Sequence, residues 1–256
     1  MVPISLQRLQ LPEKRSSRLR RRLKRLRWLR FTNNRKLIPN LFTLGNALFG
    51  FSSIVWAASG HFVAAAYFIL LGAIMDALDG RIARLMRTTS DFGVQLDSLS
   101  DAISFCLAPA FLVYTWHLKH GGAIGFTMSA LFLLAGVLRL ARFNVTHLQQ
   151  NINFIGLPTT LAGCFLSIVL LNTRTLLITP ALTTAFIMLV TTLAVLMISS
   201  VPFPTFKHLP VPKYIAAPAL LIFSVFAVAM GLTRILLALF VVYFSLAFIQ
   251  LITRRK

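Results

Sequence analysis

The sequence predicts an all-α protein, a polytopic integral membrane helix bundle of about eight transmembrane helices. Only 12% of its 256 residues are charged and 57% are hydrophobic, whereas soluble globular proteins carry about 25% charged residues. Apolar runs of roughly 17–25 residues recur from residue 37 to the C-terminus, the length that crosses a hydrocarbon core about 30 Å thick. Short segments of alternating apolar and polar residues, the pattern of a membrane β-barrel, do not occur.

The first 36 residues form a separate basic tail that precedes the predicted membrane domain, 37–256. The tail holds 13 Lys and Arg residues of a chain whose formal net charge is +20, and it lacks the apolar core of a signal peptide. Leu19, Leu23, Leu26 and Leu29 follow helical spacing, which predicts an amphipathic helix. We expect this helix to lie on anionic membrane lipids. A nucleic-acid-binding arm and a solvated tail are the alternatives, and we expect no nucleic-acid partner.

The predicted spans follow the apolar runs, although weak boundaries near Arg174 and Gly231 leave six or seven spans open. Under the positive-inside rule the basic tail is cytoplasmic. With eight spans the C-terminus is cytoplasmic too, and ten basic residues then lie at cytoplasmic ends against three outside. We therefore expect an integral protein of the cytoplasmic (inner) membrane. The spans are expected over 37–59, 62–87, 92–117, 121–146, 157–173, 177–200, 213–230 and 232–252.

All five aspartates of the chain fall within the stretch MDALDGRIARLMRTTSDFGVQLDSLSD, residues 75–101. Asp76 and Asp79 close the second span, and Asp97 and Asp101 open the third. Spacings of three and four residues place each pair on one face of a helix. The two helices can therefore direct four carboxylates toward one point near the cytoplasmic face.

Four unpaired carboxylates at membrane depth would be costly, since one Asp at a helix centre costs about 2.5–3.5 kcal/mol on insertion scales. Divalent cations would relieve that cost. Oxygen ligands suit hard ions, so we expect two ions, Mg²⁺ or Mn²⁺, with Ca²⁺ as a non-productive occupant. Ion pairs with Arg81, Arg84 and Arg87 are the alternative. Asp91 follows a polar turn and is interpreted as a helix cap.

Small residues accompany the carboxylates. Gly80 and Gly93 each cost a helix about 1 kcal/mol relative to Ala, and Ala83 lies one turn beyond Asp79. Together these residues leave room for a ligand to approach closely. Close helix packing through small residues is the competing explanation.

The pattern D-x₂-D-G-x₂-A-R-x₈-G-x₃-D-x₃-D resembles the signature of the CDP-alcohol phosphatidyltransferases at all eight defined positions. The resemblance implies an enzyme that displaces CMP from a CDP-linked lipid with the hydroxyl of a second substrate. It implies that the four aspartates of the pattern bind two divalent ions and that Asp101 is also the general base. It further implies that the remaining positions shape the nucleotide site: Gly80, Ala83, Arg84 and Gly93.

Two further segments resemble the membrane-integral phosphatidylserine synthase branch of that family. Asn40, Thr43 and Asn46 form a polar stripe on the first span, which we expect to face the nucleotide or diphosphate. The alternative is that these residues bond neighbouring helices. RLARFN at the end of the fourth span brings Arg139, Arg142 and Asn144 to the cytoplasmic side. A pair of arginines matches a carboxylate, so we expect this segment to bind serine; membrane anchoring by the arginines is the alternative.

The predicted reaction therefore joins CDP-diacylglycerol to L-serine and releases CMP. Choline as acceptor would call for an aromatic cage, which the cytoplasmic side of the sequence lacks. Glycerol 3-phosphate and an inositol phosphate would also need basic residues in their binding site, so both remain alternative acceptors. A cation transporter is the alternative of a different class, although the single acidic cluster near one face does not suit it. A homodimer is implied by the family resemblance alone.

Overall fold

The structure is a computed structural model that describes residues 34–85, 91–147, 156–199, 234–235 and 237–240. Over these residues the chain is helical and contains no strand, as predicted. Residues 1–33 of the basic tail, with its predicted amphipathic helix, lie outside the described residues, as do the turn at residues 86–90 and most of the last two predicted spans. The last residues of the tail, from Asn34, belong to α2. The helices are α2 (Asn34–Ala58), α3 (Phe62–Leu85), α4 (Asp91–Asp101), η1 (Ala102–Leu107), α5 (Ala108–Trp116), η2 (Leu118–Gly121), α6 (Gly122–His147), α7 (Thr159–Asn172) and α8 (Pro180–Ile198).

Five helical segments in the described part are long and apolar enough to cross a membrane. They correspond to the first four predicted spans and the sixth. The third segment combines α4, η1 and α5 into one span of 26 residues, Asp91–Trp116. The fifth predicted span is a helix of only 14 residues, α7, and the described residues directly before Thr159, 156–158, are not helical.

Local sequence signals set the helix boundaries. Gly60 has a φ of 80°, a left-handed conformation that favours glycine, and it separates α2 from α3. Thr179 caps α8 because its hydroxyl oxygen accepts a hydrogen bond from the Leu182 backbone N–H at 3.2 Å. Pro180 then occupies the first turn of α8, where its missing N–H costs nothing.

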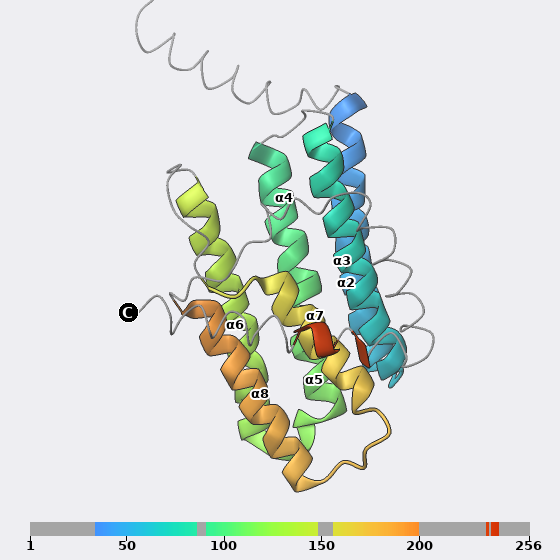
Figure 1. Ribbon diagram of the computed structural model, residues 1–256, viewed down its shortest axis with the longest axis vertical. Coiled ribbons are helices and arrows are strands. Elements are labelled where there is room, and N and C mark those ends of the chain that lie inside the picture. Colours follow the sequence, from blue (N-terminus) through green and yellow to red (C-terminus); the bar gives the residue numbers. More distant parts are fainter. Residues whose placement is uncertain (1–33, 86–90, 148–155, 200–233, 236, 241–256) are drawn as a thin grey trace, which may run out of the picture.

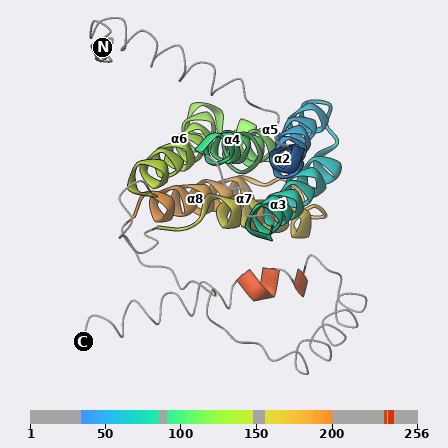
Figure 2. The same ribbon diagram turned by 90° about the horizontal axis from the view of Figure 1, so that it is seen from above.

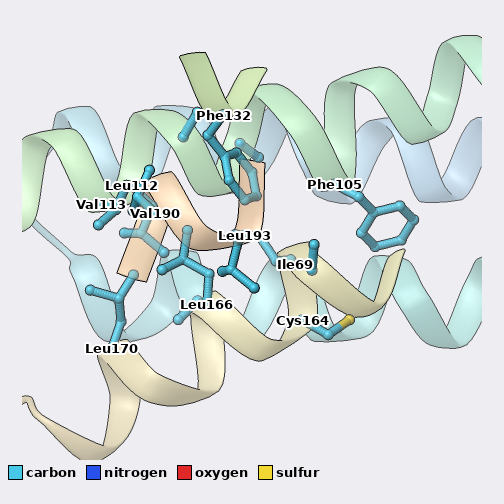
Figure 3. Packing of buried hydrophobic residues seen from close by; sticks show 14 of the residues in the cluster. Ile69, Phe105, Leu112, Val113, Phe132, Cys164, Leu166, Leu170, Val190 and Leu193 are labelled. Atoms are coloured by element: carbon cyan, nitrogen blue, oxygen red, sulfur yellow. The ribbon is translucent and has the colours of Figure 1, made fainter. Parts of the chain in front are cut away.

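The helices pack in two rows. Figure 2 shows α6, α4, α5 and α2 in one row and α8, α7 and α3 in the other. Apolar side chains from both rows meet between them, and Figure 3 shows Leu112 and Val113 of α5 beside Val190 and Leu193 of α8, with Leu166 of α7 nearby. This core fixes the row that contains α4 against the row that contains α3.

One end of the bundle collects the helix ends that flank the acidic stretch. α2 and α4 begin at this end, and α3 and α6 finish there (Figure 1). The connection between α3 and α4 is therefore short, and the carboxylates of both helices lie in the same half of the bundle. The outer face of α2 carries exposed apolar side chains at helical spacing, which suits contact with lipid: Leu41, Leu44, Leu48, Phe51 and Val55.

Candidate active site

Aspartates from α3 and α4 converge as the sequence predicts. Carboxylate oxygens of Asp76, Asp97 and Asp101 all lie within 4.8 Å of one another. Asp79, only 5% exposed, is close enough to interact electrostatically with each of the other three. Asp91 is exposed at the first residue of α4 and stays outside the cluster.

The donor atoms of this cluster suit divalent cations. Asp79 Oδ2 and Asp97 Oδ1 are buried oxygens without a hydrogen-bond partner, and buried polar atoms normally have one. Adjacent carboxylates with unpartnered oxygens repel one another unless a cation lies between them. The ligand set is oxygen only, which Mg²⁺, Mn²⁺ and Ca²⁺ prefer. Asp76, Asp97 and Asp101 therefore fit a metal site, and the fourth predicted ligand, Asp79, lies beside this group without being part of it.

The cluster is not at the extreme end of the two helices. α3 continues for at least nine residues beyond Asp76, and Asp101 is ten residues from the first described residue of α4. At 1.5 Å per residue, these distances along the helices are about 14–15 Å. Both carboxylates therefore lie inside the helical part of the predicted spans 62–87 and 92–117.

The polar stripe of α2 faces the cluster. Thr43 is 4% exposed; its hydroxyl donates to the Pro39 carbonyl at 3.1 Å and lies within reach of Asp79. Asn46 is fully buried, and its Nδ2 donates to Asp101 Oδ1 at 3.2 Å. Asn40, one turn before Thr43, is partly exposed. Thr43 and Asn46 thus contact the carboxylates, and Asn40 lies nearer the end of the bundle.

The small residues of the motif lie on the same segment of α3. A Cβ added to Gly80 would meet nothing within 4 Å, so there is open space beside Asp79. Ala83 is partly buried one turn further along. The side chain of Arg84 lies outside the described residues, and Gly93 is a partly exposed residue in the first turn of α4.

The three residues expected to bind serine differ in their surroundings. Arg139 is 8% exposed, and its Nε is buried without a hydrogen-bond partner; it interacts electrostatically with Asp101. Arg142 Nη1 donates to the Ile198 carbonyl at 3.1 Å, at the end of α8. Asn144 Oδ1 accepts from the Ser98 hydroxyl at 2.9 Å, which ties α6 to α4.

Sequence reasoning missed Ser104, about one turn after Asp101, and Gly50, against which it packs. Ser104 is fully buried and donates its hydroxyl hydrogen bond to the Asn46 carbonyl at 2.8 Å. Gly50 of α2 lies directly against Ser104. A serine about one turn after Asp101 and a glycine about one turn after Asn46, both within apolar segments, are the signals that could have identified them.

The helices are long and apolar enough to cross a membrane, and the converging carboxylates form an acidic site suited to metal cations. The chain is therefore a membrane protein with a candidate metal-binding site. The chain belongs to the CDP-alcohol phosphatidyltransferase family, because the sequence model of that family matches residues 36–244. It is therefore an enzyme of this family, and the resemblance drawn from the aspartate motif is confirmed.

Individual relatives refine the comparison. The chain is 40% identical over 173 residues to a CDP-diacylglycerol–serine O-phosphatidyltransferase of Helicobacter pylori, covering 67% of this chain and 73% of the relative. It is 33% identical over 170 residues to the Bacillus subtilis protein of the same name, covering 66% of this chain and 91% of the relative. An archaetidylserine synthase of Methanothermobacter thermautotrophicus is 38% identical over 169 residues, which cover 65% and 69% of the two chains.

Proposed function

We propose that the enzyme transfers a phosphatidyl group from CDP-diacylglycerol to the hydroxyl of L-serine and so forms phosphatidylserine and CMP. The observation that carries this proposal is the meeting of the Asp76, Asp97 and Asp101 carboxylates within 4.8 Å, on the motif of the matched family. Two relatives whose names give serine as the acceptor support this choice, and the matched region covers most of the length of each relative.

In the proposed reaction Asp101 acts as general base. It accepts the proton of the serine hydroxyl while the serine oxygen forms a bond to the phosphorus that carries the diacylglycerol. The bond from that phosphorus to the oxygen bridging the two phosphates breaks, and CMP leaves with the bonding electrons. Holding the hydroxyl in line with the breaking bond supplies much of the rate enhancement.

The four carboxylates have a second role as ligands of two divalent cations, Mg²⁺ or Mn²⁺. When bound, such cations neutralise the charge that builds on the departing CMP phosphate. The unpartnered oxygens of Asp79 and Asp97 support this role. Asp97 lies on the α4 side of the cluster and Asp79 on the α3 side, so cations would also hold these helices together.

The nucleotide is proposed to occupy the open space beside Gly80, where no side chain fills the gap. We assign Asn40 and Thr43 of α2 to this nucleotide site, with Ala83 and Arg84 of α3 and Gly93 of α4. The contact of Thr43 with Asp79, the residue before Gly80, supports the assignment. Glycine and alanine permit a flat base to approach the backbone closely.

Serine is proposed to bind through its carboxylate to Arg139. The buried Nε of Arg139 has no partner of its own, and a guanidinium matches a carboxylate in geometry. Arg142 adds positive charge one turn away, and Asn144 holds α6 against α4 through Ser98. The electrostatic interaction between Arg139 and Asp101 supports a serine site next to the proposed base.

We place the enzyme in the cytoplasmic (inner) membrane with eight spans, both termini in the cytoplasm and the site opening to that side. The distribution of basic residues supports this orientation. In this arrangement the basic tail lies on anionic lipids and copies of the chain form a homodimer.

The test is release of CMP from CDP-diacylglycerol by purified enzyme with Mn²⁺ or Mg²⁺. Serine, glycerol 3-phosphate and inositol phosphate are compared as acceptors at matched concentrations. We expect CMP release with serine and little release with the other two. No release with serine would reject the proposed acceptor, and release with glycerol 3-phosphate alone would reassign it.

A further inference from the structure

A π-helical turn follows Asp101 directly. η1 spans Ala102–Leu107, between α4 and α5, and its wider turn is closed by a hydrogen bond from the Ala108 backbone N–H to the Ile103 carbonyl. Such turns are rare and occur frequently at functional sites. The sequence explains its position, because Pro109 lacks an N–H and its ring would clash with the carbonyl four residues earlier in a regular α-helix.

Three neighbouring helices hold this turn through glycines. Ser104, Phe105 and Cys106 of the turn are each fully buried. A Cβ on Gly163 of α7 would lie 2.9 Å from the Phe105 carbonyl oxygen. A Cβ on Gly50 of α2 or Gly136 of α6 would clash with Ser104 or Cys106, respectively. Each of the three consecutive buried residues therefore meets a position on a different helix that has no room for a side chain.

A chain of hydrogen bonds links the turn to the Asp101 carboxylate. The Ser104 hydroxyl donates to the Asn46 main-chain carbonyl at 2.8 Å, and Asn46 Nδ2 donates to Asp101 Oδ1 at 3.2 Å. The Asn46 side chain is fully buried, and its Oδ1 has no partner. The amide nitrogen must face Asp101, because an amide oxygen there would repel the carboxylate.

We propose that Asn46 and Ser104, together with the π-helical turn, are positioning residues for Asp101: they fix the plane of its carboxylate so that it meets the acceptor hydroxyl. The turn fixes the backbone of Asp101 from one side, and Asn46 holds one carboxylate oxygen from the other. The sequence predicted that Asn46, as part of the polar stripe, contacts the nucleotide or diphosphate. In this proposal Asn46 instead orients Asp101. This inference rests on the proposed function of Asp101 as general base.

Steady-state kinetics with shape-matched variants separate the two roles of Asn46. Asn46→Leu keeps the branched shape and removes the donor, and Ser104→Ala removes only the hydroxyl. We expect Asn46→Leu to lower kcat by about tenfold to a hundredfold, the range for a lost hydrogen bond to a charged group or a small misplacement of a reacting group. The KM for CDP-diacylglycerol should change by less than about twofold.

Ser104→Ala should lower kcat by about threefold to tenfold, because it removes a neutral hydrogen bond that acts through Asn46. In the Asn46→Leu background the same change should have little further effect, since residues that act through one contact are not additive. Ser53→Ala is the matched control. Ser53 is a fully buried serine two turns further along α2 whose hydroxyl has no partner, and its loss should leave kcat unchanged.

The outcomes are distinct. Wild-type enzyme that releases no CMP would reject the proposed function itself. With active wild type, a raised KM for CDP-diacylglycerol at unchanged kcat in Asn46→Leu would assign Asn46 to nucleotide binding and overturn the inference. Additive losses from Asn46→Leu and Ser104→Ala would also overturn it. If Asn46→Leu does not fold, an unchanged kcat in folded Ser104→Ala is sufficient to refute the inference, and a loss matching its predicted range supports it.

Discussion

Replacing Asp97 by Asn tests whether the acidic cluster is built for cations rather than for stability. Asp97 faces both Asp76 and Asp101, with carboxylate oxygens within 4.8 Å. In the metal-free protein the substitution removes the repulsion of Asp97 by Asp76, Asp79 and Asp101, so we expect Asp97→Asn to be more stable than wild type. With Mn²⁺ present the order should reverse, because the variant has lost a charged ligand.

The magnitude follows from the geometry. Two unit charges 4.8 Å apart repel by about 3.5 kcal/mol at an effective dielectric constant of about 20. Water screens the partly exposed Asp97, so we expect a total gain of about 2 kcal/mol in the free energy of unfolding. A gain of that size corresponds to a rise of about 4–8 °C in the thermal midpoint of a chain of this length. Cation at about 100 times its Kd should stabilise wild type by about 2.7 kcal/mol.

The assay is thermal unfolding of chelator-treated protein in detergent, monitored by tryptophan fluorescence, with and without Mn²⁺. Asp91→Asn is the matched control, because it is the same substitution on the same helix at an exposed residue outside the cluster. It should change neither the metal-free midpoint nor the response to Mn²⁺. Equal responses to Mn²⁺ in wild type and Asp97→Asn, or a lower metal-free midpoint in the variant, would refute the reasoning.

Three further predictions concern packing, pH and the acceptor. Gly163→Ala should lower the thermal midpoint, since overpacking costs about 1–3 kcal/mol and its Cβ would meet backbone of the π-helical turn at 2.9 Å; Gly45→Ala, with nearest contacts at 3.9 Å, should not. Burial and the neighbouring His120 lower the pKa of His117 from 6.5 to about 4, so stability should fall as pH decreases from 6.5 toward 4. His117→Phe should reduce the difference in midpoint between about pH 7.5 and about pH 5, and an unchanged difference would contradict this. Arg139→Ala should raise the KM for serine at least tenfold more than that for CDP-diacylglycerol, whereas equal effects would indicate a structural role.

The length of the apolar runs predicted five membrane-crossing helices of the described residues correctly. Chain segments of 20 or more apolar residues became α2, α3, the α4–α5 span and α6, since backbone hydrogen bonds within lipid can be satisfied only inside a helix. The π-helical turn inside the third span escaped prediction. Its cause is local, in Pro109, but its stability depends on glycines from α2, α6 and α7, and their juxtaposition is a property of the tertiary structure.

In the site, too, local sequence predicted some features and tertiary structure determined the others. Spacings of three and four residues were enough to place the aspartates on facing sides of α3 and α4. The sequence could not show that Asn46 points its amide at Asp101, because a polar stripe on one helix does not reveal which neighbour it faces. Nor could it separate Arg139, whose Nε is unpartnered, from Arg142, which is bonded to the end of α8.

The most direct test of the central claim is transfer of radiolabelled serine into lipid by wild type and Asp101→Asn in vesicles containing CDP-diacylglycerol and Mn²⁺. We predict labelled phospholipid and an equal amount of CMP with wild type. Asp101→Asn should form neither while still binding the nucleotide. Labelled lipid at wild-type rate from Asp101→Asn, or CMP release by wild type without incorporation of serine, would contradict the account.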